Sequence, residues 1–335
     1  MNKQADDEWF LVVRDATDEL RVVAKNAEPV EWRRLTNVLR GWKFKAATEL
    51  IEECAATREV VAGRGYVAPV MAPDGKTPHA FLVSLDSPQS GGVPTVGTWT
   101  WDFGDPTVPP VLSFSESALD LLGVALDHRD RTLYGPADFF TRTIRFADIL
   151  THLAFLYDSS TGETRIARTS FRGDDGTAQD LYVAEVVTGD ASTRAVRGLA
   201  WTAAAPDALQ RSIEIADNEL AVLLANNSNQ LVLIGDLRFP AAPYVLKWVT
   251  PHPPGIGHGV STGQAPGLHP DDLGKLIEYV WMLGNLAPGE EVPEISDVRV
   301  RRAGGGWMNG RGKGFRLDPD HFPTIWVALV AEMTG

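Results

Sequence analysis

Cysteine is nearly absent from this sequence: Cys54 is the only one in 335 residues. A single cysteine excludes an intramolecular disulfide and is typical of a chain that folds in a reducing compartment. The first eight residues are polar and acidic, so they do not have the basic and then apolar pattern of a secretory signal peptide. No apolar run approaches the roughly 20 residues that span a bilayer. We therefore expect a cytoplasmic protein with no membrane segment.

Positive charge is also scarce. The sequence has 31 Lys and Arg residues against 44 Asp and Glu residues, which gives a formal net charge of −13 at pH 7. An acidic chain repels nucleic-acid phosphates unless a local basic patch overrides the average, so we expect no nucleic acid partner. Hydrophobic residues make up 44% and charged residues 22%. These values are ordinary for globular domains and exclude a fibrous repeat or a long disordered chain.

Composition and periodicity divide the chain into four parts. We predict a domain at residues 1–90, a second at 96–205, a linker helix at 206–222 and a third domain at 223–335. The first boundary is a stretch rich in Pro, Ser and Gly at 84–94, which is typical of a loop or linker.

Apolar periodicity predicts the elements within these parts. The second and third domains share one order: strands, then helices, then three consecutive strands. This order predicts an α+β fold in which each domain is an antiparallel sheet with helices on one face. In the first domain we expect a strand over 9–13, helices over 31–42 and 46–56, and strands over 65–71 and 79–85. In the second we expect strands over 97–102, 163–172, 180–188 and 197–203 and helices over 115–123 and 146–157; in the third, strands over 231–237, 244–250, 297–303, 306–317 and 324–332 and a helix over 271–286.

Several short motifs carry a family resemblance. The third domain has HPDDL at 269–273, RVRRAGGGW at 299–307 and WVALV at 326–330. In this order and spacing they resemble a PAS domain of bacterial signalling proteins. The second domain resembles another PAS domain through GTWTWD at 97–102 and SESALDLLG at 115–123. The HPDD signature is absent there, which weakens the carry-over of any ligand chemistry and leaves that of the fold.

The order of elements in the first domain is similar to that of a short GAF domain. The whole arrangement therefore resembles the actinobacterial, mycobacterial-type GAF–PAS–PAS proteins, which are sensor modules without an attached output domain. The resemblance implies a sensory or signal-transduction protein that acts by small-molecule sensing, by protein–protein interaction or by both. It also implies an unidentified signalling protein as the partner, and no output domain in this chain.

Two other functions stay open beside the sensor. A ligand-free scaffold or interaction protein would have filled cores and would act only through its partners. A hydrolase would use Ser261, which lies in the pattern GVSTG at 259–263 between His258 and His269. That pattern needs a sharp strand-to-helix turn, whereas a loop rich in Gly and Pro surrounds it here. We therefore expect no catalytic residue and no enzyme activity.

The histidines and the thiol give little support for a cofactor. The seven histidines include no closely spaced ligand pair, so we expect no metal site. His152 lies in a helical stretch of the second domain, where some PAS domains ligate haem, but a core or surface histidine with satisfied hydrogen bonds is the interpretation that we favour. Cys54 lies outside both PAS-like domains, which leaves no cysteine for flavin photochemistry. We predict no cofactor, and an unidentified small-molecule ligand stays compatible with the sequence.

The third domain has two candidate interaction surfaces. Arg299 and Arg301 belong to a basic cluster, which is either a solvated strand face with carboxylate partners or a docking surface for an acidic partner. The final strand is apolar on both faces, with Trp326 and Val330 on one of them. Soluble monomers tend to avoid an exposed apolar row of this kind. We therefore expect the linker helix, or a second subunit of a homodimer, to cover the Trp326 face.

Overall fold

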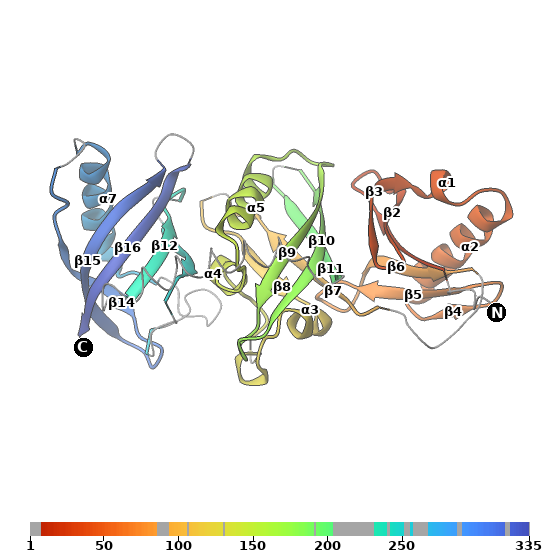
Figure 1. Ribbon diagram of the computed structural model, residues 1–335, viewed down its shortest axis with the longest axis horizontal. Coiled ribbons are helices and arrows are strands. Elements are labelled where there is room, and N and C mark those ends of the chain that lie inside the picture. The colour runs from red at the N-terminus through yellow and green to blue at the C-terminus, as the bar shows by residue number, and fades with distance from the viewer. Residues whose placement is uncertain are drawn as a thin grey trace, which may run out of the picture. The chain divides into compact units, whose positions relative to one another are not determined.

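Three antiparallel sheets with helices between their strands make up the computed structural model (Figure 1), which confirms the α+β class. The structure describes residues 8–85, 94–105, 107–129, 131–190, 192–203, 231–239, 242–250, 255–256, 267–286, 290–318 and 322–334. The expected linker helix at 206–222 lies outside these residues. No helix in the described part of the chain is both long enough and apolar enough to cross a membrane.

The chain forms two compact units. The first contains residues 1–104, 113–130 and 147–207, and the second contains residues 105–112, 131–146 and 208–335. The first unit therefore holds the first sheet and most of the second. The second unit holds the third sheet together with a short helical segment, 131–146.

The first sheet has six strands in the order β3-β2-β1-β6-β5-β4. Helices α1 and α2 cover one face (Figure 1). Central strand β1 is apolar on both sides because both are covered: Phe10 and Val12 pack with the helices, while Leu11 and Val13 pack with residues of the second sheet. The elements are β1 (Trp9–Arg14), β2 (Leu20–Lys25), β3 (Glu28–Arg34), α1 (Leu35–Val38), α2 (Trp42–Thr57), β4 (Val61–Ala62), β5 (Tyr66–Met71) and β6 (Pro78–Ser84).

The predicted helix over 31–42 is wrong in its first part, which belongs to edge strand β3. Arg33 and Arg34 pair with β2, and the backbone hydrogen bonds of this pairing replace those of a helix. Trp32 has a φ of 40°, which a right-handed helix does not allow. Its indole Nε1 donates to the carbonyl oxygen of Arg165 at 3.4 Å, so contact with the second sheet fixes this segment.

The second sheet has the order β8-β7-β11-β10-β9, and its predicted strands and its helices over 115–123 and 146–157 are confirmed. Ser115 accepts a hydrogen bond from the backbone N–H of Ala118 and so begins α3; Gly123, at a φ of 63°, follows the end of that helix. The elements are β7 (Val96–Asp102), β8 (Val111–Phe114), α3 (Glu116–Leu121), η1 (Leu126–His128), α4 (Pro136–Phe140), α5 (Phe146–Asp158), β9 (Thr164–Arg172), β10 (Ala178–Thr188) and β11 (Ala195–Thr202).

The third sheet has the order β13-β12-β16-β15-β14, which repeats the order of the second sheet. The segment that contains α4 binds to β13 in this unit. Lys247 donates to the carbonyl oxygens of Phe140 and Thr143, and the backbone N–H of Trp248 donates to Thr141 Oγ1 at 3.2 Å. The elements are β12 (Leu231–Asp236), β13 (Tyr244–Trp248), α7 (Pro270–Gly284), β14 (Ile295–Arg301), β15 (Trp307–Asp318) and β16 (Phe322–Thr334).

All three sheets place their first strand beside their last. The paired residues are Trp9 and Ser84 in the first sheet, Val96 and Trp201 in the second, and Leu231 and Val330 in the third. The shared order expected for the second and third domains is therefore confirmed. The first sheet has the same order with β3 added at its edge.

Candidate functional site

A row of four residues crosses the second sheet from β7 to β9. Trp99 pairs with Gly198, Gly198 with Glu185, and Glu185 with Arg165. Residues opposite each other on antiparallel strands share a face. Gly198 has no side chain, and a Cβ added there would lie 2.1 Å from Cε2 and Nε1 of Trp99. The glycine therefore lets the indole ring lie across β11 and reach Glu185.

The carboxylate of Glu185 is the centre of a buried polar cluster. Trp99 Nε1 donates to its Oε1 at 3.2 Å, and Arg165 Nη1 donates to its Oε2 at 3.0 Å. From α5, His152 Nε2 lies 2.9 Å from Oε1. Glu185 is 0% and His152 4% exposed. We call Trp99, His152, Arg165 and Glu185 the Glu185 cluster.

The cluster has a defined charge state. Burial by itself would raise the pKa of the Glu185 carboxyl, but the hydrogen bonds and charges of His152, Arg165 and Trp99 outweigh burial and hold that pKa below its ordinary value. Burial is the main cause that lowers the pKa of His152, and Glu185 offsets it only in part. At neutral pH the carboxylate is therefore charged, the imidazole is neutral, and Nε2–H donates to Glu185.

The Glu185 cluster occupies the centre of the helix-covered face with the protein's own side chains. Trp101, also fully buried, meets His152 edge-on at a ring separation of 6.0 Å. His152 is thus a core histidine hydrogen-bonded to Glu185, and ligation of haem through Nε2 would require that bond to break. The motifs in the sequence do not point to Glu185 or Arg165; the available signal concerns Glu185 alone, which is a charged residue within the apolar run 181–187 of β10.

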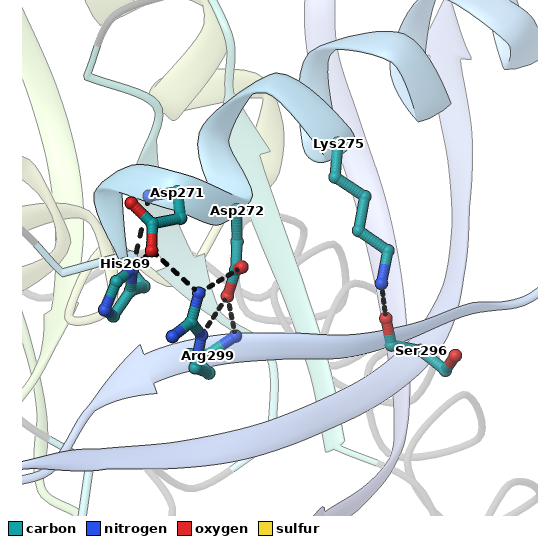
Figure 2. A network of polar contacts seen from close by, with 6 residues as sticks. All are labelled: His269, Asp271, Asp272, Lys275, Ser296 and Arg299. Atoms are coloured by element: carbon teal, nitrogen blue, oxygen red, sulfur yellow. Dashed lines mark hydrogen bonds and ion pairs between the residues drawn. The ribbon is translucent and has the colours of Figure 1, made fainter.

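The HPDD motif of the third sheet forms the start of α7 (Figure 2). His269 is the N-cap residue, and its Nδ1 accepts a hydrogen bond from the backbone N–H of Asp271 at 3.2 Å. Pro270 begins the helix, and the carboxylates of Asp271 and Asp272 lie in the first turn, where the helix dipole favours negative charge. This sequence therefore sets where the helix begins.

Asp272 joins α7 to edge strand β14. Its carboxylate accepts hydrogen bonds from the backbone N–H, Nε and Nη2 of Arg299, each at 2.8 Å (Figure 2). The Arg299 side-chain hydrogen bond is the largest of the causes that lower the pKa of Asp272 to about 2. Farther along the helix, Lys275 donates to the backbone oxygen of Ser296. The motif thus clamps the helix to the sheet.

The basic cluster is largely engaged within the third sheet. Arg299 binds Asp272, and the guanidinium of Arg301 lies 3.9 Å from the ring centre of Trp307. Arg311 lies 4.0 Å from the carboxylate of Glu294. These contacts fit the strand-face interpretation. The interface role of Arg299 and Arg301 stays a prediction.

The Trp326 face lies on the side of the third sheet that α7 covers. Gly314 pairs with Ala328, and a Cβ added at Gly314 would lie within 3.5 Å of side chains of α7. Trp326 and Val330 are each two residues from Ala328 and share its face; Trp326 is 7% exposed. In the described residues the domain's own helix therefore lies on this face, and the expected cover by the linker helix or a second subunit stays a prediction. The interface role of both residues stays a prediction.

The outer side of α7 exposes an apolar surface that the sequence motifs do not identify. Ile277 and Trp281 are four residues apart, and Trp281 is 74% exposed. An open groove of about 720 Å³ runs beside them, between the helix and residues 293–296. The spacing of these two residues is the available sequence signal, because residues i and i+4 share a helix face.

The remaining candidates take little part in a site. Ser261 and His258 lie outside the described residues. Cys54 is fully buried on α2, and burial raises the pKa of its thiol to about 11. Among the described residues, no group of three or more His, Cys, Asp and Glu side chains is placed to hold a metal ion.

No protein-family model and no curated protein matches this sequence. Among solved structures, the chain is similar to an uncharacterized protein from Mycobacterium tuberculosis, with 20% identity, a TM-score of 0.66, and coverage of 98% of this chain and 95% of that one.

Two further solved structures match less well. A sensory box histidine kinase/response regulator from Burkholderia thailandensis matches with 16% identity, a TM-score of 0.23, and coverage of 40% of this chain and 92% of that one. An RNA-binding light-oxygen-voltage receptor matches with 11% identity, a TM-score of 0.26, and coverage of 70% and 94%. The mycobacterial protein thus shares the fold over nearly the whole chain. The TM-scores of the other two structures are too low to support an argument.

Proposed function

We propose that this protein is a PAS-like signal-transduction protein whose second domain works without a bound cofactor and which acts by contact with another protein. The observation that carries the proposal is the Glu185 cluster. Its side chains fill the centre of the helix-covered face and satisfy one another's hydrogen bonds, so a cofactor there would have to displace buried, paired groups at a high cost.

The PAS-like part rests on topology and sequence together. The second and third sheets repeat one strand order with helices between the second and third strands of each. The HPDD motif at 269–273 forms the helix start and its clamp to the sheet. A GAF-like first domain, a cytoplasmic location, a signalling partner and the absence of enzyme activity belong to the same proposal.

Action through another protein is supported by α7. Its outer side presents Trp281 and Ile277 to solvent, and tryptophan is among the residues that contribute most to protein–protein binding. A scaffold function without sensing is the alternative, and the response of the second domain to a signal separates the two.

Native mass spectrometry of the full chain as purified tests the cofactor-free part. We expect the mass of the polypeptide alone or of its oligomer. A small molecule retained by the wild type and lost in a Trp99→Ala variant would show that the second domain holds a ligand, and would overturn this part.

Capture experiments with matched variants test the protein-contact part. Trp281→Asp should lose a partner that the wild type captures, whereas Leu126→Asp, which alters another exposed apolar side chain, should keep it. Equal capture by both variants would exclude the outer side of α7 as the contact surface.

A further inference from the structure

The charges of the Glu185 cluster balance only while His152 is neutral. The carboxylate of Glu185 carries one negative charge and Arg165, at 3.0 Å, carries one positive charge. A proton on His152 would leave one net positive charge at a site that is almost fully buried. An unbalanced buried charge is costly in a protein interior, so the packed arrangement disfavours protonation.

We propose that His152 is a proton-binding site through which acid pH releases α5 from the second sheet. The inference rests on the proposed function, because it supplies a signal to which a domain without a cofactor can respond. His152 is the residue by which α5 contacts Glu185. Once α5 leaves the sheet, the imidazole reaches water and binds a proton freely, which stabilises the released state.

Within the described part of the chain, the other charged groups around α5 do not supply a further anion on the sheet side. Glu185 on β10 and Arg165 on β9 face His152 directly, and β7 contributes indole rings. Beside β11, Arg194 Nη2 donates to the carbonyl oxygen of Leu156 on α5 at 2.9 Å, which adds a second cation. On α5 itself the carboxylates are Asp148, one turn before His152, and Asp158, at the last position of the helix.

The size of the response follows from proton linkage. The pKa of His152 is lowered in the packed state and returns to its ordinary value of 6.5 when the helix is released. A group with a lowered pKa of this kind destabilises the packed state as pH falls below 6.5. Proton binding by the released state multiplies the opening equilibrium by at most about 1.1 at pH 7.5 and at most about 11 at pH 5.5, so acid should increase opening by up to about tenfold.

Hydrogen–deuterium exchange of the full chain tests this response. Peptides from α5 (Phe146–Asp158) are followed at pH 7.5 and 5.5, with rates corrected for the intrinsic effect of pH on exchange. The wild type should show an increase in opening of more than twofold and up to about tenfold. His152→Gln should show less than a twofold increase, because the amide can donate to Glu185 and does not titrate. His79→Gln should keep the wild-type increase; it removes another histidine of the first unit, whose pKa burial lowers to about 4.

A direct titration of His152 by NMR in the wild type gives a second readout that needs no variant. We expect no titration of the packed state near pH 6.5. Three results would each overturn the inference. The first is titration of His152 near pH 6.5 while α5 is still protected from exchange. The others are no change in the opening of the wild type between the two pH values, and the same increase in His152→Gln as in the wild type. A ligand retained in native mass spectrometry would instead count against the proposed function and leave the acid response standing.

Discussion

Gly198 is a position where one added methyl group should damage the second sheet. In a Gly198→Ala variant the new Cβ would lie 2.1 Å from the Trp99 ring, so the indole must move. Forcing a buried core apart costs about 1–3 kcal/mol, and losing the hydrogen bond from Trp99 to the charged Glu185 costs about 1.5–3 kcal/mol. We expect the free energy of unfolding to fall by about 2.5–6 kcal/mol.

Urea denaturation followed by tryptophan fluorescence measures this loss. Gly63→Ala is the matched control, because Gly63 lies in the same unit and a Cβ there would meet no atom within 4 Å; its effect should stay within about 0.5 kcal/mol. In a Trp99→Leu background, Gly198→Ala should cost less than about 1 kcal/mol, because the clash is gone. An equal cost of Gly198→Ala in both backgrounds would refute the reasoning.

Three other outcomes follow from the structure. Asp272→Asn should destabilise the third sheet by about 1.5–3 kcal/mol, because it removes the charged hydrogen bonds of Asp272 to Arg299. The pKa of Asp272 is lowered to about 2, so the stability that its carboxylate contributes is present above pH 3.8 and is lost as pH falls through 2. The acid denaturation curves of the wild type and the variant should therefore converge near pH 2. Trp326→Asp should lower the melting temperature strongly, whereas Trp281→Asp, at an exposed position, should leave it within a degree or two; similar shifts would contradict the burial of Trp326. Cys54 should not react with Ellman's reagent at pH 8 until the protein unfolds, because its thiol is buried and its pKa is raised to about 11; fast labelling of native protein would show that α2 opens.

The strands of the second and third sheets could be predicted because the apolar pattern of their sequences matches the burial of their residues in the fold. Trp99 and Trp101 alternate with polar residues, and both are fully buried. Edge strand β3 could not be predicted in the same way. Its residues include four charged ones, and only the pairing with β2 and the contact of Trp32 with the second sheet make it a strand.

The Glu185 cluster could not be predicted from the local sequence pattern either, for a different reason. Its members come from four elements, and Trp99 and Glu185 are 86 residues apart. Strand register brings Trp99, Glu185 and Arg165 together, and no motif encodes that register. The packing of α5 against the sheet adds His152. Two residues break the local pattern in a way that signals the cluster: Glu185 within the apolar run 181–187 of β10, and Gly198 in the middle of β11. The clamp between Asp272 and Arg299, by contrast, lies within a motif that the sequence does show.

The pairing of first and last strands gives each sheet a particular response to tension. The chain enters and leaves the second sheet at one point, because Val96 lies opposite Trp201. A force that pulls on both flanking segments therefore acts at the same end of the pair β7 and β11. It breaks the hydrogen bonds between these strands one after another, whereas a shear force would load all of them at once. The same geometry recurs where Leu231 lies opposite Val330. A pull along the chain would thus open a sheet between its central strands at low force, starting beside the buried Trp201.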